Sequence, residues 1–187
     1  MFSAVLDTSV IFPARLNDTL LSFAEQDLYR PLWSEEILNE LRVALSRTYP
    51  HRNPRSVEAR VMAMCRAFPA ATVAGWEKVA EEIASSLPDA QDAHVIAAGR
   101  IGGAQVIVTN NLKDFPSNAL SEWGMRPLSA DQVLMELWRS NTSIALSALH
   151  IQSTRLRKPP LSPEEILDQL TASVPGFSRL ARQSLHA

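Results

Sequence analysis

The stretches FSAVLDTSVI at residues 2–11 and AQVIVT at residues 104–109 decide the fold. Both are apolar runs without polar alternation, which is typical of a strand buried on both faces of a parallel sheet. Shorter runs at residues 29–33, 72–76 and 125–128 predict three further strands. Because helical patterns separate these strands, the sequence predicts an α/β fold with a mainly parallel sheet.

Helices are expected in the intervals, at residues 13–26, 34–47, 55–67, 77–86, 88–102 and 129–138. Ser34 is a favourable N-cap, because two glutamates follow it in the first turn. Ser129 is expected to cap the last of these helices. The pair Gly102-Gly103 is a natural C-terminal stop.

The length of 187 residues suffices for one ordinary domain with a small appendage. After about residue 140 the composition changes to Ser, Ala and Leu, then to a basic, proline-containing linker at 155–160. No strand pattern follows, and SPEE at 162–165 is a capping box that opens another helix. We therefore expect a domain over residues 1–139 and a helical extension over residues 140–187.

The composition excludes several classes of protein. Hydrophobic residues make up 46% and charged residues 20%, as in a globular protein with a core. The single cysteine, Cys65, excludes a disulfide framework within the chain and a multi-cysteine metal site. The N-terminus lacks the basic segment of a signal peptide, and no apolar run approaches the ~18 residues of a membrane span. A cytoplasmic protein is expected.

The net charge of −2 hides a segregation of charge along the chain. Residues 41–70 carry many arginines and one acid, Glu58, whereas residues 71–92 carry several acids and one base, Lys78. One interpretation is an ordinary solvated helical face. The other is a basic arm beside an acidic pocket, as a metal-dependent enzyme acting on a polyanion needs.

Four acids fall where the predicted fold would gather them. Asp7 follows the first strand and Asp114 lies shortly after the second, and open α/β sheets bind ligands at these strand ends. Asp92 lies in the first turn of its helix on the apolar face, and Glu40 lies at the rim of another apolar face. Each acid alone is also explained as a turn, cap or surface residue. Together they predict an oxygen-rich site suited to Mg²⁺ or Mn²⁺, and with four histidines and one cysteine nothing points to zinc.

Other acidic α/β sites fit less well. A haloacid-dehalogenase-like phosphatase needs an acid at position 9, which is Ser9, and a receiver domain needs an acidic pair where Thr8 follows Asp7. The glycine-rich fingerprints of dinucleotide and phosphate loops are absent from the sequence.

The order of LDTS (6–9), SEEILNEL (34–41), LPDAQDAHVIAA (87–98) and VTNNLKDFP (108–116) resembles the PIN-domain nucleases. The likeness is greatest to the VapC-type toxins of bacterial toxin–antitoxin pairs, and it covers roughly residues 2–138. The resemblance implies a three-layer α/β/α fold and Mg²⁺- or Mn²⁺-dependent hydrolysis of RNA phosphodiester bonds. It also implies a homodimer that a small antitoxin holds inactive.

The resemblance assigns roles to individual residues. The four catalytic and metal-binding acids are expected to be Asp7, Glu40, Asp92 and Asp114. Supporting residues around them are expected to be Ser9, Asp89, Thr109 and Asn111. Whether Asp89, Asn111 or Asp114 completes the metal shell stays open. Apart from the resemblance, the arginine-rich segment supplies the residues expected to contact RNA, which are Arg42, Arg47, Arg52 and Arg55.

Two rival functions keep the same fold. One is a DNA-directed nuclease. Nucleases of that kind carry more acids and have long helical insertions, and this chain has neither. The other is a nucleic-acid-binding scaffold without cleavage, against which the intact acids argue. The C-terminal extension carries apolar residues between 161 and 180. We expect them either to pack on the sheet domain or to contact a second subunit or the antitoxin.

Overall fold

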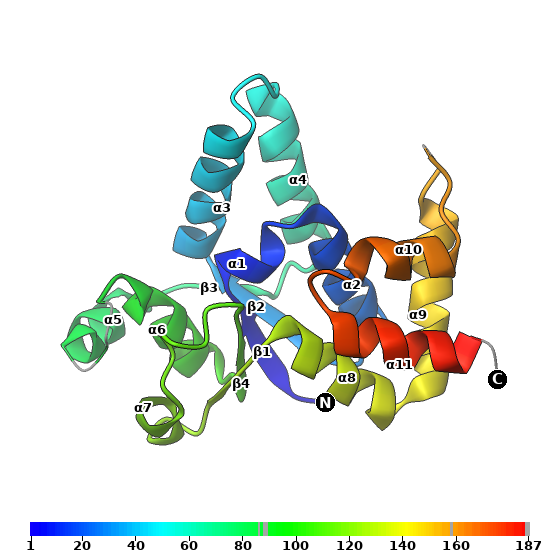
Figure 1. Cartoon of the computed structure of the whole chain (residues 1–187). Helices are drawn as coiled ribbons and strands as arrows, with labels where there is room; N and C mark the ends of the chain where they lie inside the picture. Colours follow the sequence, from blue (N-terminus) through cyan, green and yellow to red (C-terminus); the bar gives the residue numbers. More distant parts are fainter. Residues whose placement is uncertain (86, 88–89, 158, 186–187) are drawn as a thin grey trace.

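A computed structural model describes residues 1–85, 87, 90–157 and 159–185 of the chain (Figure 1). Its centre is a sheet of five strands in the order β3-β2-β1-β4-β5, in which all pairs are parallel. The strands are β1 (Ser3–Leu6), β2 (Arg30–Ser34), β3 (Thr72–Val73), β4 (Val106–Val108) and β5 (Arg126–Leu128). The predicted α/β fold with a parallel sheet is confirmed.

The first apolar run is only partly a strand. β1 ends at Leu6, and after Asp7 the chain turns at once into the short helix α1 (Thr8–Ile11). Val10 and Ile11 are fully buried in that helix. A short buried helix and a buried strand have the same apolar pattern, so periodicity could not separate them.

Helices cover both faces of the sheet, as the three-layer α/β/α prediction requires. On one face α6 (Ala93–Gly102) packs on β1 and β2, with α5 (Glu77–Ala84) and the 3-10 turn η1 (Ala90–Asp92) beside it. Gly102 allows close packing there, because a Cβ atom at this residue would lie 2.8 Å from Leu32 Cδ1. On the other face lie α2 (Ala14–Glu25) and α8 (Ala130–Ser140), while α7 (Ser117–Ser121) leads into β5.

Helices α3 (Glu35–Thr48) and α4 (Pro54–Ala67) form a hairpin that projects from the body of the molecule (Figure 1). The predicted cap is present, since the Ser34 side chain accepts a hydrogen bond from Ile37 N at 3.2 Å. Asn53 caps α4 in the same way through Arg55 N, with proline at the first helical position. We call this unit the α3–α4 hairpin.

The C-terminal extension consists of α9 (Thr142–Arg155), α10 (Pro163–Leu170) and α11 (Pro175–Leu185), packed beside α2 and α8. Phe177 of α11 is fully buried, with its ring centroid 5.8 Å from that of Phe23 and 5.7 Å from that of Trp138. The extension therefore buries its apolar residues within its own chain, the first of the two expected arrangements. The division at residues 139 and 140 stays a prediction. Among the described helices, none has both the length and the apolar character needed to cross a membrane.

Candidate active site

Asp7 lies at the carboxyl edge of the sheet, between the ends of β1 and β4. Its backbone N–H donates to Val108 O at 3.0 Å, which extends the ladder by one bond. Its carboxylate is only 8% exposed, and Oδ2 accepts hydrogen bonds from Ser9 Oγ at 2.6 Å and Thr109 Oγ1 at 2.8 Å. Both hydroxyls therefore bind the same carboxylate oxygen, Oδ2.

The two hydroxyls are themselves fixed by the loop after β4. Ser9 Oγ accepts a hydrogen bond from Asn110 N at 2.9 Å, and Thr109 Oγ1 accepts one from Asn111 N at 3.0 Å. The Asn110 side chain also donates to Ser9 O at 3.2 Å. The structure therefore brings Ser9 and Thr109 to Asp7, and their role as supporting residues of a metal site stays a prediction.

Asp114 is held within that same loop. The Asn111 side-chain amide donates to Asp114 Oδ2. Both residues lie near the carboxyl edge of the sheet, and their direct bond couples two of the candidates for the last position of the metal shell. The choice between them stays a prediction.

Glu40, on α3, meets two residues that the sequence analysis did not single out. Thr8 Oγ1 donates to Glu40 Oε2 at 2.6 Å, and it also lies 3.3 Å from Ile37 O. His94, on α6, places Nε2 3.5 Å from the same Glu40 oxygen. Thr8 therefore holds Glu40 through the oxygen beside which His94 lies, as Ser9 and Thr109 hold Asp7.

The His94 ring is buried and oriented by its other nitrogen. The residue is 7% exposed, and Nδ1 lies 2.7 Å from Gln91 O. The Trp76 ring packs edge-on against it, with centroids 5.9 Å apart and an interplanar angle of 61°.

The pKa values of Glu40 and His94 shift in opposite directions. Burial raises the pKa of Glu40. The contacts with His94 and Thr8 together lower it by more than burial raises it, so its pKa lies below the ordinary value. Burial lowers the pKa of His94, but Glu40 and the Gln91 carbonyl raise it more, so its pKa lies above the ordinary value. Both shifts favour the charged forms of the two side chains.

Asp92 lies where α6 begins, two residues before His94. It is half-buried and occupies the N-cap position between η1 and α6. Asp89, its predicted partner, is outside the described residues. Glu40 thus lies on α3, whereas Asp92 ends η1 and caps α6, the helix that carries His94.

The predicted carboxylates do not converge on one preformed metal-binding site in the described part of the chain. Within residues 1–85, 87, 90–157 and 159–185, no three Asp, Glu, His or Cys side chains lie close enough together to hold a metal ion. The donor types nevertheless fit a divalent cation, because Asp7 and Glu40 are buried or half-buried carboxylates whose partners are mainly neutral hydroxyl groups. No Lys or Arg forms an ion pair with either of them in the described part of the chain.

A hollow of about 770 Å³ opens beside Glu40 along α3. Thr8, Asn39, Arg47 and Gln91 are among the residues that line it. Glu40 is the member of the predicted carboxylate set that lines it, so a polymer bound there would pass next to Glu40.

The four arginines predicted to bind RNA differ in their surroundings. Arg42 is half-buried and forms ion pairs with Glu35 at 2.7 Å and Glu58 at 2.9 Å, so its charge is already balanced. Arg47 lies on the hollow, and Arg52 stacks over the Tyr49 ring at 4.7 Å near the tip of the α3–α4 hairpin. Arg55 is exposed in the first turn of α4. RNA binding by these residues stays a prediction.

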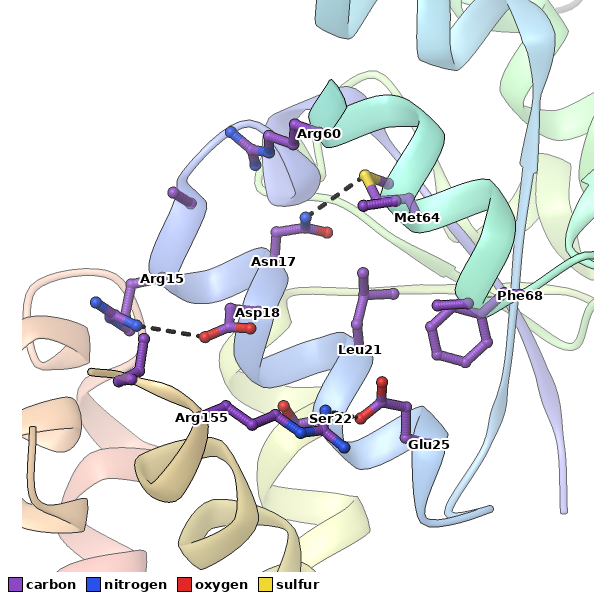
Figure 2. Close-up of a pocket in the computed structure, with 14 residues that line it drawn as sticks. Arg15, Asn17, Asp18, Leu21, Ser22, Glu25, Arg60, Met64, Phe68 and Arg155 are labelled. Atoms are coloured by element: carbon purple, nitrogen blue, oxygen red, sulfur yellow. Dashed lines mark hydrogen bonds and ion pairs between the residues drawn. The ribbon is translucent and has the colours of Figure 1, made fainter. Parts of the chain in front are cut away.

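A second hollow, of about 470 Å³, lies between α2 and α4 (Figure 2). Both of its acids pair with arginines, with Arg15 3.3 Å from Asp18 and Arg155 bound to Glu25. The third arginine that lines it, Arg60, donates to the backbone carbonyls of Ile11 and Phe12. Because no carboxylate of this hollow is without a basic partner, we assign the chemistry to the carboxyl edge of the sheet.

Comparisons with known proteins identify the family of the chain. A family model of the PIN domain matches residues 3–113, and a model of the VapC50 C-terminal domain matches residues 130–183. A curated protein of Mycobacterium tuberculosis (strain ATCC 25618 / H37Rv), named "Putative ribonuclease VapC50", is 34% identical over 96 residues. That match covers 50% of this chain and 55% of the relative, so it spans about half of the relative's length. No solved structure matches the chain significantly. Since the PIN-domain match covers more than half of the chain and the C-terminal match follows it, the chain belongs to the PIN-domain family and is VapC-like.

Proposed function

We propose that this chain is a metal-dependent endoribonuclease that hydrolyses RNA phosphodiester bonds, and that it is the toxin of a toxin–antitoxin pair. The observation that carries the proposal is the way Asp7 and Glu40 are held. Each carboxylate is fixed through one oxygen by a hydroxyl group, at the carboxyl edge where β1 meets its neighbours. The likeness to a relative named as a ribonuclease supports RNA as the substrate.

In this mechanism Asp7, Glu40 and Asp92 would hold Mg²⁺ or Mn²⁺, with Asp114 as the fourth carboxylate. When bound, such an ion lowers the pKa of a water molecule and neutralises charge on the phosphate. Ser9 and Thr109 orient Asp7, and Asn111 orients Asp114.

The α3–α4 hairpin would bring RNA to this site. Carboxylates repel the phosphates of the substrate, so productive binding needs positive charge nearby. Arg47, Arg52 and Arg55 supply it along the hollow and the hairpin tip. Contacts of this kind bind the RNA backbone without reading its sequence.

The proposed partners follow from the VapC-like character of the chain. They are a second copy of the chain, in a homodimer, and a small antitoxin protein that blocks cleavage. A cytoplasmic location belongs to the same proposal, because RNA and the antitoxin would meet the enzyme there.

A cleavage assay tests the proposal. The full chain is incubated with an RNA oligonucleotide and with DNA of the same sequence, while Mg²⁺ or Mn²⁺ is titrated and a chelator serves as blank. We expect metal-dependent cleavage of RNA, reduced about 100-fold or more in Asp7→Asn, which removes one charge from the site. The matched control is Asp27→Asn, because Asp27 is exposed before β2, at the opposite edge of the sheet. Its positive φ of 56° is one that asparagine adopts readily.

Three results would contradict the proposal. Unchanged cleavage in Asp7→Asn would exclude the metal site. Cleavage of DNA alone would indicate the DNA-directed nuclease, and RNA binding without any cleavage would indicate the scaffold.

A further inference from the structure

We infer that His94 is a nitrogen ligand of the metal ion that Glu40 binds, so that the site prefers Mn²⁺ to Mg²⁺. This inference rests on the proposed function and adds a residue to the four carboxylates. It starts from the surroundings of one ring nitrogen, Nε2 of His94.

The first step is the hydrogen that the other ring nitrogen carries. Gln91 O is a carbonyl oxygen and can only accept, so at 2.7 Å the His94 Nδ1 must donate its hydrogen to it. A histidine that binds a metal through one nitrogen almost always donates the other N–H to a carbonyl or carboxylate. Gln91 O provides that second contact.

The second step is the state of Nε2. It is buried, and within the described residues it makes no hydrogen bond of good geometry. A buried polar atom of this kind is unfavourable unless something binds it. Its nearest polar partner is the Glu40 carboxylate, which is itself a metal-binding group.

The third step is the distance between the two donors. Nε2 lies 3.5 Å from Glu40 Oε2, which is long for a hydrogen bond. Donors that share one ion, with bonds of about 2.1 Å and angles of about 90° to 110°, lie roughly 3.0 to 3.4 Å apart. A small movement of either side chain suffices for both to bind one ion, which would take the place of a proton on Nε2.

The fourth step is the choice of metal. Mg²⁺ binds oxygen donors and rarely imidazole, whereas first-row transition metals accept both. An imidazole added to carboxylates therefore raises the affinity for Mn²⁺ more than the affinity for Mg²⁺. With four histidines, the sequence did not predict a nitrogen ligand. One histidine at the right position is nevertheless enough to supply it.

The test is pulsed electron paramagnetic resonance on the full chain loaded with Mn²⁺ alone. We expect the echo modulation of a ¹⁴N nucleus bound to the ion, and its replacement by the ¹⁵N pattern after labelling with ¹⁵N-histidine. The modulation should persist in His150→Ala and vanish in His94→Gln. His150 is a matched control, because its Nδ1 also lies 2.9 Å from a carbonyl, that of Leu146, but its ring is exposed on α9.

Metal titration supplies a second readout. His94→Gln should weaken Mn²⁺ binding at least about 10-fold and Mg²⁺ binding much less. Equal weakening of both ions would contradict the inference and would leave His94 as a residue that positions Glu40. Should His94→Gln fail to fold, replacing the other three histidines by alanine leaves His94 as the single histidine of the chain. Modulation that persists in that variant supports the inference, and its loss overturns it.

The outcomes separate this inference from the proposed function. Bound Mn²⁺ without ¹⁴N modulation in the wild-type chain overturns the inference even where RNA is cleaved. Modulation from His94 in a chain that cleaves no RNA would uphold the inference and contradict the proposed function.

Discussion

Thr8 joins the two halves of the candidate site. Its backbone follows directly after Asp7, and its hydroxyl donates to Glu40 at 2.6 Å. A change in the position of Glu40 therefore affects Thr8, the residue next to Asp7. Because the hydroxyl is neutral, it fixes the carboxylate without cancelling the charge that a cation needs.

We predict that Thr8→Val weakens metal binding about 10-fold, because partners that orient a ligand contribute about that much to affinity. Valine has nearly the shape of threonine but cannot donate to Glu40 Oε2. Isothermal titration with Mn²⁺ measures the change, and Thr8→Ser, which keeps the hydroxyl, should bind nearly as the wild type does. Wild-type affinity in Thr8→Val would show that the bond to Glu40 has no part in the site.

The sequence located the Asp7 half of the site and missed partners of the Glu40 half. The contacts of Asp7 with Ser9 and Thr109 join the ends of two neighbouring parallel strands, which a strand prediction already places together. His94 reaches Glu40 only because α3 and α6 pack side by side, and that packing is a tertiary feature. A histidine inside the apolar segment AHVIAA (93–98) was the available signal, since a buried imidazole needs a polar partner.

At the scale of elements, arginines bind the two helices of the α3–α4 hairpin to each other and to α1. Arg42 of α3 binds Glu58 of α4, and Arg60 of α4 donates to Ile11 O and Phe12 O at the end of α1. These arginines serve the packing of the hairpin. The cations near its tip, Arg52 and Arg55, remain available to a polyanion.

We predict that Arg52→Gln with Arg55→Gln weakens RNA binding and reduces its salt dependence. For single-stranded RNA each lost phosphate contact lowers the slope of log K against log salt by about 0.7, so two lost contacts lower it by about 1.4. Fluorescence anisotropy at several salt concentrations measures the slope. The control is Arg100→Gln with Arg139→Gln, two exposed arginines near the C-terminal ends of α6 and α8. An unchanged slope in the Arg52 and Arg55 variant would make the hairpin tip an ordinary solvated face.

The starts of helices were predictable where the local sequence contains an N-cap residue. Ser34, Ser129 and Ser162 all cap helices in the structure, the last two in complete capping boxes. Helix α9 falls within the predicted helical extension, but its bounds were not predicted, because its apolar residues do not lie on one side of the helix. It is held by tertiary contacts such as that of Gln152 with Thr19, which no local rule foresees.

The start of α11 depends on one acid from α8. Asp131 accepts hydrogen bonds from Gly176 N at 3.1 Å and Phe177 N at 2.7 Å, and so satisfies two N–H groups that have no partner within the helix. We predict that Asp131→Ala lowers the free energy of unfolding by about 1 kcal/mol, as loss of an N-cap does. Urea denaturation measures it, and Asp131→Asn, which keeps an acceptor, should lose less. Equal losses in both variants would indicate that the charge, and not the hydrogen bonds, stabilises the helix.

At the scale of the whole molecule, the C-terminal extension and the sheet share one core. Phe177 from α11, Phe23 from α2 and Trp138 from α8 pack their rings together, and all three are buried. Trp138 Nε1 also donates to Ser184 Oγ at 3.2 Å. The surface of α2 and α8 that the extension covers is therefore apolar and would be exposed to water without it.

We predict that Phe177→Ala lowers the free energy of unfolding by about 3 to 5 kcal/mol, because it opens a cavity among buried rings. Ile144→Ala is the control, since Ile144 is 38% exposed and its loss should change stability by no more than about 0.5 kcal/mol. Truncation after Ser153 removes α10 and α11 and should abolish soluble folded protein for the same reason. A truncated chain that stays folded, together with a near-neutral Phe177→Ala, would show that residues 1–153 fold without α10 and α11. These two helices would then be free to meet a second subunit or the antitoxin, the arrangement that the burial of Phe177 argues against.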